Sequence, residues 1–113
     1  GTSEKKLKEN PDEVFRMVRA TLRGLAFSWD KRNHDQVIDI IMREMKPIGA
    51  SLANESLTQV MRVITKDGSV KGESSQVLID RGRENAKVTR PVTVNQVVDF
   101  SFLEKAQKEL GMR

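Results

Sequence analysis

The sequence contains no cysteine and no tyrosine, and it has a single histidine and a single tryptophan. Without cysteine the chain can form no disulfide, no thiolate metal site and no cysteine nucleophile. A lone histidine cannot supply the paired histidines or His/Cys clusters of zinc sites. We therefore expect no metal centre and no cofactor. Aromatic residues make up only 4% of the chain, which leaves little aromatic mass for a core.

Long apolar runs and phosphate-binding loops are also missing. No apolar run approaches the roughly 20 residues that span a bilayer, and the start of the chain does not resemble a signal peptide. Lys66-Asp67-Gly68-Ser69 predicts a turn rather than a glycine-rich phosphate loop. The chain opens Gly1-Thr2-Ser3 instead of with methionine, which we interpret as the sign of a processed or excised segment.

Charge is plentiful but balanced. Charged residues make up 32% of the 113 positions, and the formal net charge is +4. Acidic and basic residues are interleaved throughout, so we expect solvated helix faces and no nucleic-acid partner. The length suits one domain with a modest core. No repeat or linker divides the chain, and residues 1–113 are predicted to form a single helical segment.

The strongest local signal lies in residues 10–29. Asn10 is expected to cap a helix with its side chain, and Pro11 suits the first helical position. Asp12 and Glu13 then place carboxylates at the positive end of the helix dipole. Apolar residues recur at helical spacing on one face, and arginines occupy the other: Val14, Phe15, Val18, Leu22, Leu25, Ala26 and Trp29 against Arg16, Arg19 and Arg23.

Two more helices are predicted by the same periodicity. One begins at Asn33 or Asp35 and ends before Pro47 and Gly49, and the next covers about 50–65 and stops at Gly68. Their expected inward faces are Val37, Ile38, Ile41, Met42 and Met45 in the first, and Leu52, Ala53, Leu57, Val60, Met61 and Ile64 in the second.

The last third of the chain is less regular. A helix is expected over about 73–83, with Val77, Leu78 and Ile79 as its apolar contacts and Gly82 weakening its end. Residues 88–94 are β-branched and contain a proline, which predicts extended chain or an edge strand. Ser101 and Glu104 form a capping-box pattern before a final helix that Gly111 closes. The predicted fold class is thus mostly α, with four to five helices, a possible short helical turn around Leu7, and one short extended segment.

Candidate catalytic residues are few. His34 stands beside a predicted helix start, where a solvated or capping role is expected rather than a catalytic or metal-binding one. Ser74 and Ser75 have no general base in view. The acidic residues of the second helix lie among Arg43 and Lys46 and suit a solvated face. A helix-turn-helix over 37–64 would place no positive charge at the start of its second helix. We expect no enzymatic activity.

Three stretches, taken in order, resemble a known family. They are Ser3-Glu4-Lys5 leading to Asn10-Pro11-Asp12-Glu13-Val14 and then Val18 to Leu25, the Lys66-Asp67-Gly68 turn followed by Gln76 and Ile79-Asp80, and Val98 to Ala106 with Glu109-Leu110-Gly111. Together they resemble the C-terminal portion of periplasmic solute-binding proteins of the nitrate, sulfonate and taurine ABC-importer type. The same superfamily includes thiamine-pyrimidine synthases, whose chemistry relies on cysteines and histidines that this chain lacks.

The resemblance implies a two-lobed α/β protein that closes on a small molecule and presents it to an ABC permease outside the cytoplasm. The chain would be the last third of such a protein, so most of the ligand cleft would lie in the missing lobes. Gln76 is the one position carried over as a candidate ligand contact, although the aromatic residue common in the family near this position is absent.

Two further expectations follow. An isolated piece of this kind would leave apolar surface uncovered, with Phe27, Trp29, Phe100 and Phe102 as candidates together with part of the Val14–Val18–Leu22 stripe, and we expect it to self-associate. The alternative function is a small self-standing helical module that binds another macromolecule, including weak DNA binding through the arginine face.

Overall fold

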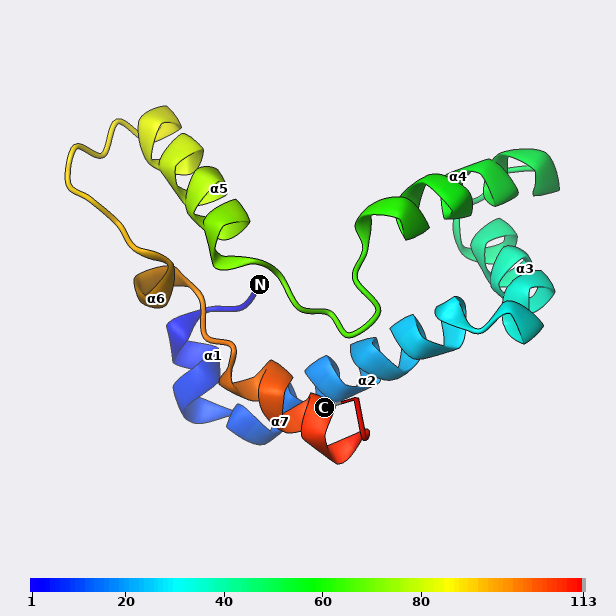
Figure 1. Ribbon diagram of the computed structural model, residues 1–113, viewed down its shortest axis with the longest axis horizontal. Coiled ribbons are helices and arrows are strands. Elements are labelled where there is room, and N and C mark those ends of the chain that lie inside the picture. Colours follow the sequence, from blue (N-terminus) through cyan, green and yellow to red (C-terminus); the bar gives the residue numbers. More distant parts are fainter. Residues whose placement is uncertain (113) are drawn as a thin grey trace.

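The computed structural model describes residues 1–112 and is mostly helical, with no β-strand in that range (Figure 1). The order of elements is α1 Glu4–Glu9, α2 Pro11–Trp29, a 3-10 turn η1 Lys31–Asn33, α3 His34–Glu44, α4 Ala50–Val63, α5 Gly72–Asn85, α6 Val94–Val97 and α7 Ser101–Glu109. The mostly α fold class is confirmed, and the five longest predicted helices all form. The short turn expected around Leu7 is the six-residue helix α1.

The long helix α2 begins at Pro11 and ends at Trp29, as the sequence predicts. The predicted side-chain cap by Asn10 is wrong, since Asn10 makes no such hydrogen bond. Its backbone N–H instead closes α1 by donating to Lys6 O at 2.9 Å. That second duty gives Asn10 a φ of −137° and a ψ of 54°, outside the β region from which a cap residue normally reaches the first turn.

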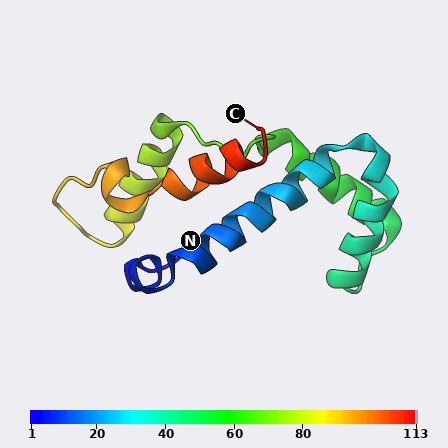
Figure 2. The ribbon, with the colours of Figure 1, turned by 90° about the horizontal axis from the view of Figure 1, so that it is seen from below.

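Helices α2 and α7 lie side by side and form the centre of the structure (Figure 2), and we call this helix pair the spine. Lys105 Nζ lies 4.4 Å from the centroid of the Phe15 ring, and Arg19 Nη1 donates to Glu109 Oε1 at 2.8 Å. From the first contact to the second the position advances by four residues on α2, from Phe15 to Arg19, and by four on α7, from Lys105 to Glu109. The two helices therefore run in the same direction. Ala106 is fully buried, and its small side chain permits their close approach.

The turn after α4 sits on this helix pair. Gly68 has a φ of +74°, the left-handed conformation that the sequence predicts for it. A Cβ at this position would lie 2.8 Å from Leu22 Cδ2 and 3.4 Å from Leu103 Cδ1. Gln107, which is 1% exposed, donates from Nε2 to Asp67 O at 2.7 Å. The turn between α4 and α5 is therefore held against both helices of the spine.

Helices α3 and α4 form a hairpin at the C-terminal end of α2. Val37 and Ile38 of α3 and Ala53 of α4 are buried. The predicted inward faces are only partly correct, because Met45, Leu52, Val60 and Ile64 are exposed. A two-helix hairpin covers one stripe of each helix, and the remaining apolar positions have no layer above them within residues 1–112.

Helix α5 and the short helix α6 form a second arm, joined by residues 86–93. The edge strand considered for 88–94 does not form; residues 88–93 have no regular structure and Val94 begins α6. The expected inward contacts Val77 and Leu78 are wrong, since both are exposed. The covered face of α5 instead runs through Ser75 and half-buried residues one turn apart, and positions 77 and 78 point away from it.

Helix α7 starts without the predicted capping box. Ser101 is its first helical residue, and its N–H donates to Asp99 Oδ1 at 2.9 Å. The structure has a capping box at α6 instead, where Gln96 Oε1 accepts from Thr93 N at 2.9 Å. Gly111 ends α7 with a φ of +67°, as expected.

The chain as a whole is open. It exposes 8957 Å² of accessible surface, whereas a compact monomer of 12.8 kDa exposes about 6,300 Å². The radius of gyration is 16.9 Å, against about 13 Å for a compact domain of this length. Five apolar side chains are buried within residues 1–112, on the spine and in the hairpin: Leu22, Val37, Ile38, Ala53 and Ala106. The excess of about 2,700 Å² is surface that a further layer could cover.

Candidate functional site

Gln76 binds the loop that follows α5. Its Nε2 donates to Val92 O at 2.8 Å and to Asp80 Oδ1 at 3.2 Å, and its Oε1 accepts from Val94 N at 3.2 Å. The side-chain amide thus pairs with the backbone on both sides of Thr93, in the way that one strand pairs with another. The arrangement fixes the end of the loop and the start of α6 against α5.

A second side chain of α5 holds the same loop. Arg83 Nη1 donates to Arg90 O at 3.0 Å. The loop begins with Lys87 at a φ of +55°, and two backbone bonds close the end of α5 around it, from Lys87 N to Glu84 O and from Val88 N to Arg83 O. Residues 87–93 are therefore held at both ends although they form no helix or strand.

For Gln76 this geometry provides a structural role that the sequence did not indicate. The residue is half-buried, and both atoms of its amide are engaged within the chain. A ligand contact by the same amide would require it to leave the backbone of Val92 or Val94. The ligand-binding role of Gln76 stays a prediction.

His34 lies at the first position of α3 and contacts α4. Its Nε2 is 2.8 Å from Asn54 Oδ1, while Asn54 Nδ2 donates to Ala50 O at 3.0 Å. Because Asn54 Oδ1 can only accept, His34 Nε2 carries the hydrogen. The contact joins the first residue of α3 to the N-terminal half of α4. No group of three or more histidine and acidic side chains in residues 1–112 is placed to hold a metal ion.

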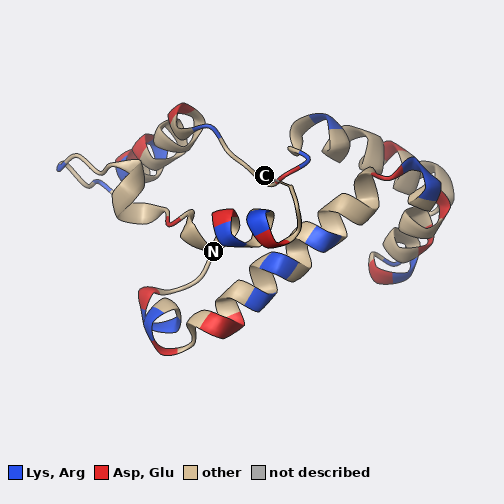
Figure 3. Cartoon of the chain, turned by 60° about the horizontal axis from the view of Figure 1, so that its bottom comes forward, with Lys and Arg blue, Asp and Glu red and all other residues tan. Residues whose placement is uncertain are grey.

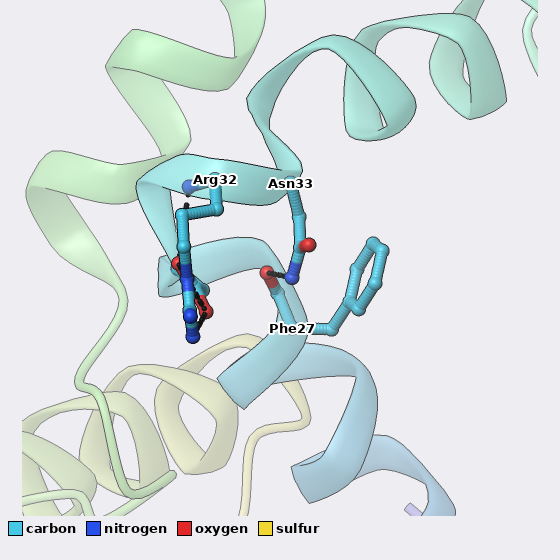
Figure 4. A network of polar contacts seen from close by, with 4 residues as sticks. Phe27, Arg32 and Asn33 are labelled. Carbon is cyan, nitrogen blue, oxygen red and sulfur yellow. Dashed lines mark hydrogen bonds and ion pairs between the residues drawn. The ribbon is translucent and has the colours of Figure 1, made fainter.

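The corner between α2 and α3 carries a network of polar contacts (Figure 4). Asn33 Nδ2 donates to Phe27 O at 3.0 Å, and Arg32 donates from its backbone and its guanidinium to the carboxylate of Asp30. The side-chain hydrogen bond from Arg32, followed by the backbone one, lowers the pKa of Asp30 from 3.8 to about 2. These bonds shape the corner and leave the carboxylate ionised, which suits a structural role rather than acid–base chemistry.

The three arginines of α2 are not a uniform basic surface. The acidic residues of α2, Asp12 and Glu13, lie in its first turn and the arginines follow them, while α7 beside α2 carries both acidic and basic residues (Figure 3). Arg19 is bound to Glu109 and lies 5.9 Å from the Phe15 ring centroid, so its charge serves the α2–α7 contact. On that face Arg16 and Arg23 are exposed, while Arg19 is half-buried. This mixture gives the DNA-binding alternative no additional support.

An apolar groove of about 380 Å³ lies between the C-terminal half of α2 and the α3–α4 hairpin, and we call it the hairpin groove. Its lining is apolar apart from one hydroxyl and consists of Gly24, Leu25, Phe27, Ser28, Val37, Ile40, Ile41, Leu57, Val60, Met61 and Ile64. The side chains of Phe27, Ile40, Val60 and Ile64 are exposed at its mouth. No titratable side chain lines it, so it offers a binding surface rather than a reaction centre.

The side chains that the sequence predicted to be uncovered are only partly the ones that the structure leaves exposed. Phe27 is exposed as expected, but Trp29, Phe100 and Phe102 are half-buried and Leu22 is 3% exposed. Trp29 is covered in part by Lys66, whose Nζ lies 5.2 Å from the indole ring. The exposed large apolar side chains also include Leu52 and Val60 of α4 and Val77 and Leu78 of α5, where the helical periodicity predicted burial.

Gln107 is the buried polar residue whose partner sequence reasoning missed. Its hydrogen bond to the Asp67 carbonyl joins positions 40 residues apart. The turn it meets is closed by Asp67 Oδ1, which accepts from Ser69 N at 3.0 Å and from Ser69 Oγ at 2.6 Å. An Asp-Gly-Ser sequence is a recognisable turn signal, whereas the identity of the helix beneath it is not encoded locally.

The remaining comparisons concern membranes and known proteins. None of the helices described between residues 1 and 112 has the length and apolarity required to cross a bilayer. Comparison of the chain with models of protein families, with curated proteins and with solved structures finds no match. The function must therefore be argued from the residues and their geometry.

Proposed function

We propose that this chain is the helical C-terminal part of a solute-binding protein that captures a small molecule for an ABC importer, and that it is not itself catalytic. The observation that carries the proposal is the excess of about 2,700 Å² of accessible surface over that of a compact monomer. Helices arranged in this way suit a layer that covers other elements of a larger protein. The resemblance of residues 10–25, 66–80 and 98–111 to that family supplies the identity of the larger protein.

The α5–α6 arm is the part we assign to contact with the missing lobes. Val77 and Leu78 are 53% and 67% exposed on α5. They lie next to Gln76, which holds the 86–93 loop. Burying a valine or leucine side chain completely is worth about 1.5–3 kcal/mol, and covering the exposed half to two-thirds of Val77 and Leu78 would supply a corresponding share of it, which favours a covering layer on this face. In the proposal the arm lies at the edge of the cleft, and Gln76 keeps its loop in place beside the solute.

The partners follow from this assignment. The solute is a small molecule held mainly by the missing lobes, the protein partner is an ABC permease, and the location is periplasmic or otherwise extracytoplasmic. No nucleic acid is involved. The paired charges of α2, with Arg19 bound to Glu109, favour this reading over a phosphate-binding face.

The test begins with the longer reading frame that contains residues 1–113. We expect it to encode upstream α/β lobes and to stand beside genes for a permease and an ATPase. The purified longer protein is then heated with taurine, an alkanesulfonate, nitrate and an aminopyrimidine in turn. A ligand that binds the folded state at 100 times its Kd stabilises it by about 2.7 kcal/mol and raises Tm accordingly.

The 113-residue chain serves as the control in the same scan. We expect no shift for it, since the cleft would be incomplete. The proposal fails if the reading frame encodes no upstream lobes, or if none of the small anions and heterocycles shifts the longer protein.

A further inference from the structure

The hairpin groove has no occupant within the described chain, and its geometry points to one. We propose that the groove is the surface through which two copies of the 113-residue chain associate, with the α3–α4 hairpins of the two copies packed into a four-helix arrangement. The inference is separate from the proposed function. It concerns the α2–α3–α4 surface, whereas that function is assigned to the α5–α6 arm.

The first support is the way the hairpin uses its apolar residues. On α3, Val37 and Ile38 are buried, while Ile40 is 42% exposed. On α4, Ala53 is buried while Val60 is 45% exposed. Each helix thus carries a second apolar stripe beside the one that its partner covers. Two hairpins that join such stripes form a bundle with a shared core.

The second support is the area. A standard interface buries about 800 Å² per partner, and obligate homodimers bury about 1,000–2,500 Å² per partner. The excess surface of about 2,700 Å², taken over the whole chain, is at least as large as the area that an interface of the obligate class buries per partner. The apolar lining of the groove also matches obligate interfaces, which are the more hydrophobic class.

The third support is the mixed charge of the helices that line the groove. Arg23 and Asp39 directly precede the lining residues Gly24 and Ile40 in the sequence, and both charged residues are exposed. In a two-fold symmetric dimer the same surface of each copy faces the other copy. A surface that carries both positive and negative side chains is therefore complementary to itself. A partner of uniform negative charge, such as a nucleic acid, would meet repulsion from Asp39.

The experiment is sedimentation equilibrium of the 113-residue chain over a range of micromolar concentrations. We expect a mass twice the monomer value of 12.8 kDa at the upper end. Val60→Glu on the groove should return the mass to that of the monomer while the helical circular dichroism is retained. Val77→Glu is the matched control, because Val77 has similar exposure on α5 outside the groove, and it should leave the dimer intact.

A second measurement covers the case in which Val60→Glu fails to fold. The chain has no cysteine, so Val60→Cys and Val77→Cys each introduce a single thiol. Maleimide labelling should become at least tenfold slower at high concentration for position 60 and stay unchanged for position 77. A monomer at every concentration, or equal labelling at both positions, would overturn the proposal and leave the groove to the lobes of a longer protein. That result would not affect the thermal-shift test.

Discussion

Replacing Gly68 by alanine tests the seating of the central turn on the spine. The φ of +74° costs a residue with a Cβ about 1–2 kcal/mol. The new methyl would lie 2.8 Å from Leu22 Cδ2, and Leu22 is buried, so overpacking adds about 1–3 kcal/mol. We expect Gly68→Ala to lower the free energy of unfolding by about 2–5 kcal/mol. Urea unfolding followed by circular dichroism at fixed protein concentration measures it.

Two further variants separate the causes. Gly82 lies inside α5 with nothing within 4 Å of a Cβ, so Gly82→Ala should be neutral or stabilise by up to about 1 kcal/mol. In a Leu22→Ala background the methyl at position 68 has room, and its cost should fall to the conformational part alone. A Gly68→Ala variant within about 0.5 kcal/mol of the parent chain would refute the reasoning, because the turn would then not be held on α2.

Three other predictions follow from described contacts. Lys87→Gly should stabilise the chain by about 1 kcal/mol in urea unfolding, because Lys87 holds a φ of +55° at the end of α5, while Lys87→Ala should bring no such gain. Gln76→Leu removes the hydrogen bond to Val94 N; amide exchange at Val94 should accelerate about tenfold or more, the equivalent of about 1.4 kcal/mol, and unchanged exchange would show that the bond does not hold the loop. The hydrogen bonds from Arg32 lower the pKa of Asp30 to about 2, below its ordinary 3.8. Their contribution to the stability of the fold is therefore present above about pH 4 and lost as the pH falls through 2. In Arg32→Ala, NMR titration should find the pKa of Asp30 shifted back toward 3.8.

The extents of the helices were predictable because their signals are local. Pro11 at the start of α2, Gly68 after α4 and Gly111 after α7 act through backbone geometry that needs no distant partner. The Thr93-x-x-Gln96 box carried the same kind of signal and was available in the sequence. It was missed because the β-branched residues around it favoured a strand.

The covered faces were less predictable, since helical spacing says which residues share a face but not whether another element lies against it. Val77 and Leu78 are apolar and helical, yet the face of α5 that the loop covers is the one with Gln76 and Arg83. Val60 of α4 was likewise predicted to face inward from its helical spacing, yet it is exposed. The Gln76 contacts join residues 16 and 18 positions apart through a side-chain amide, a pairing that no periodicity encodes.

The openness of the chain has a calorimetric consequence. The heat capacity change of unfolding is proportional to the surface that becomes hydrated on unfolding. One copy, which exposes 8957 Å² when folded, buries only about four-fifths of the surface that a compact 113-residue chain would bury on folding. A single copy should therefore melt with the shallow stability curve of a protein about one-fifth shorter. Each apolar face that a partner covers would steepen that curve, so the curvature of the melt reports how many faces are occupied.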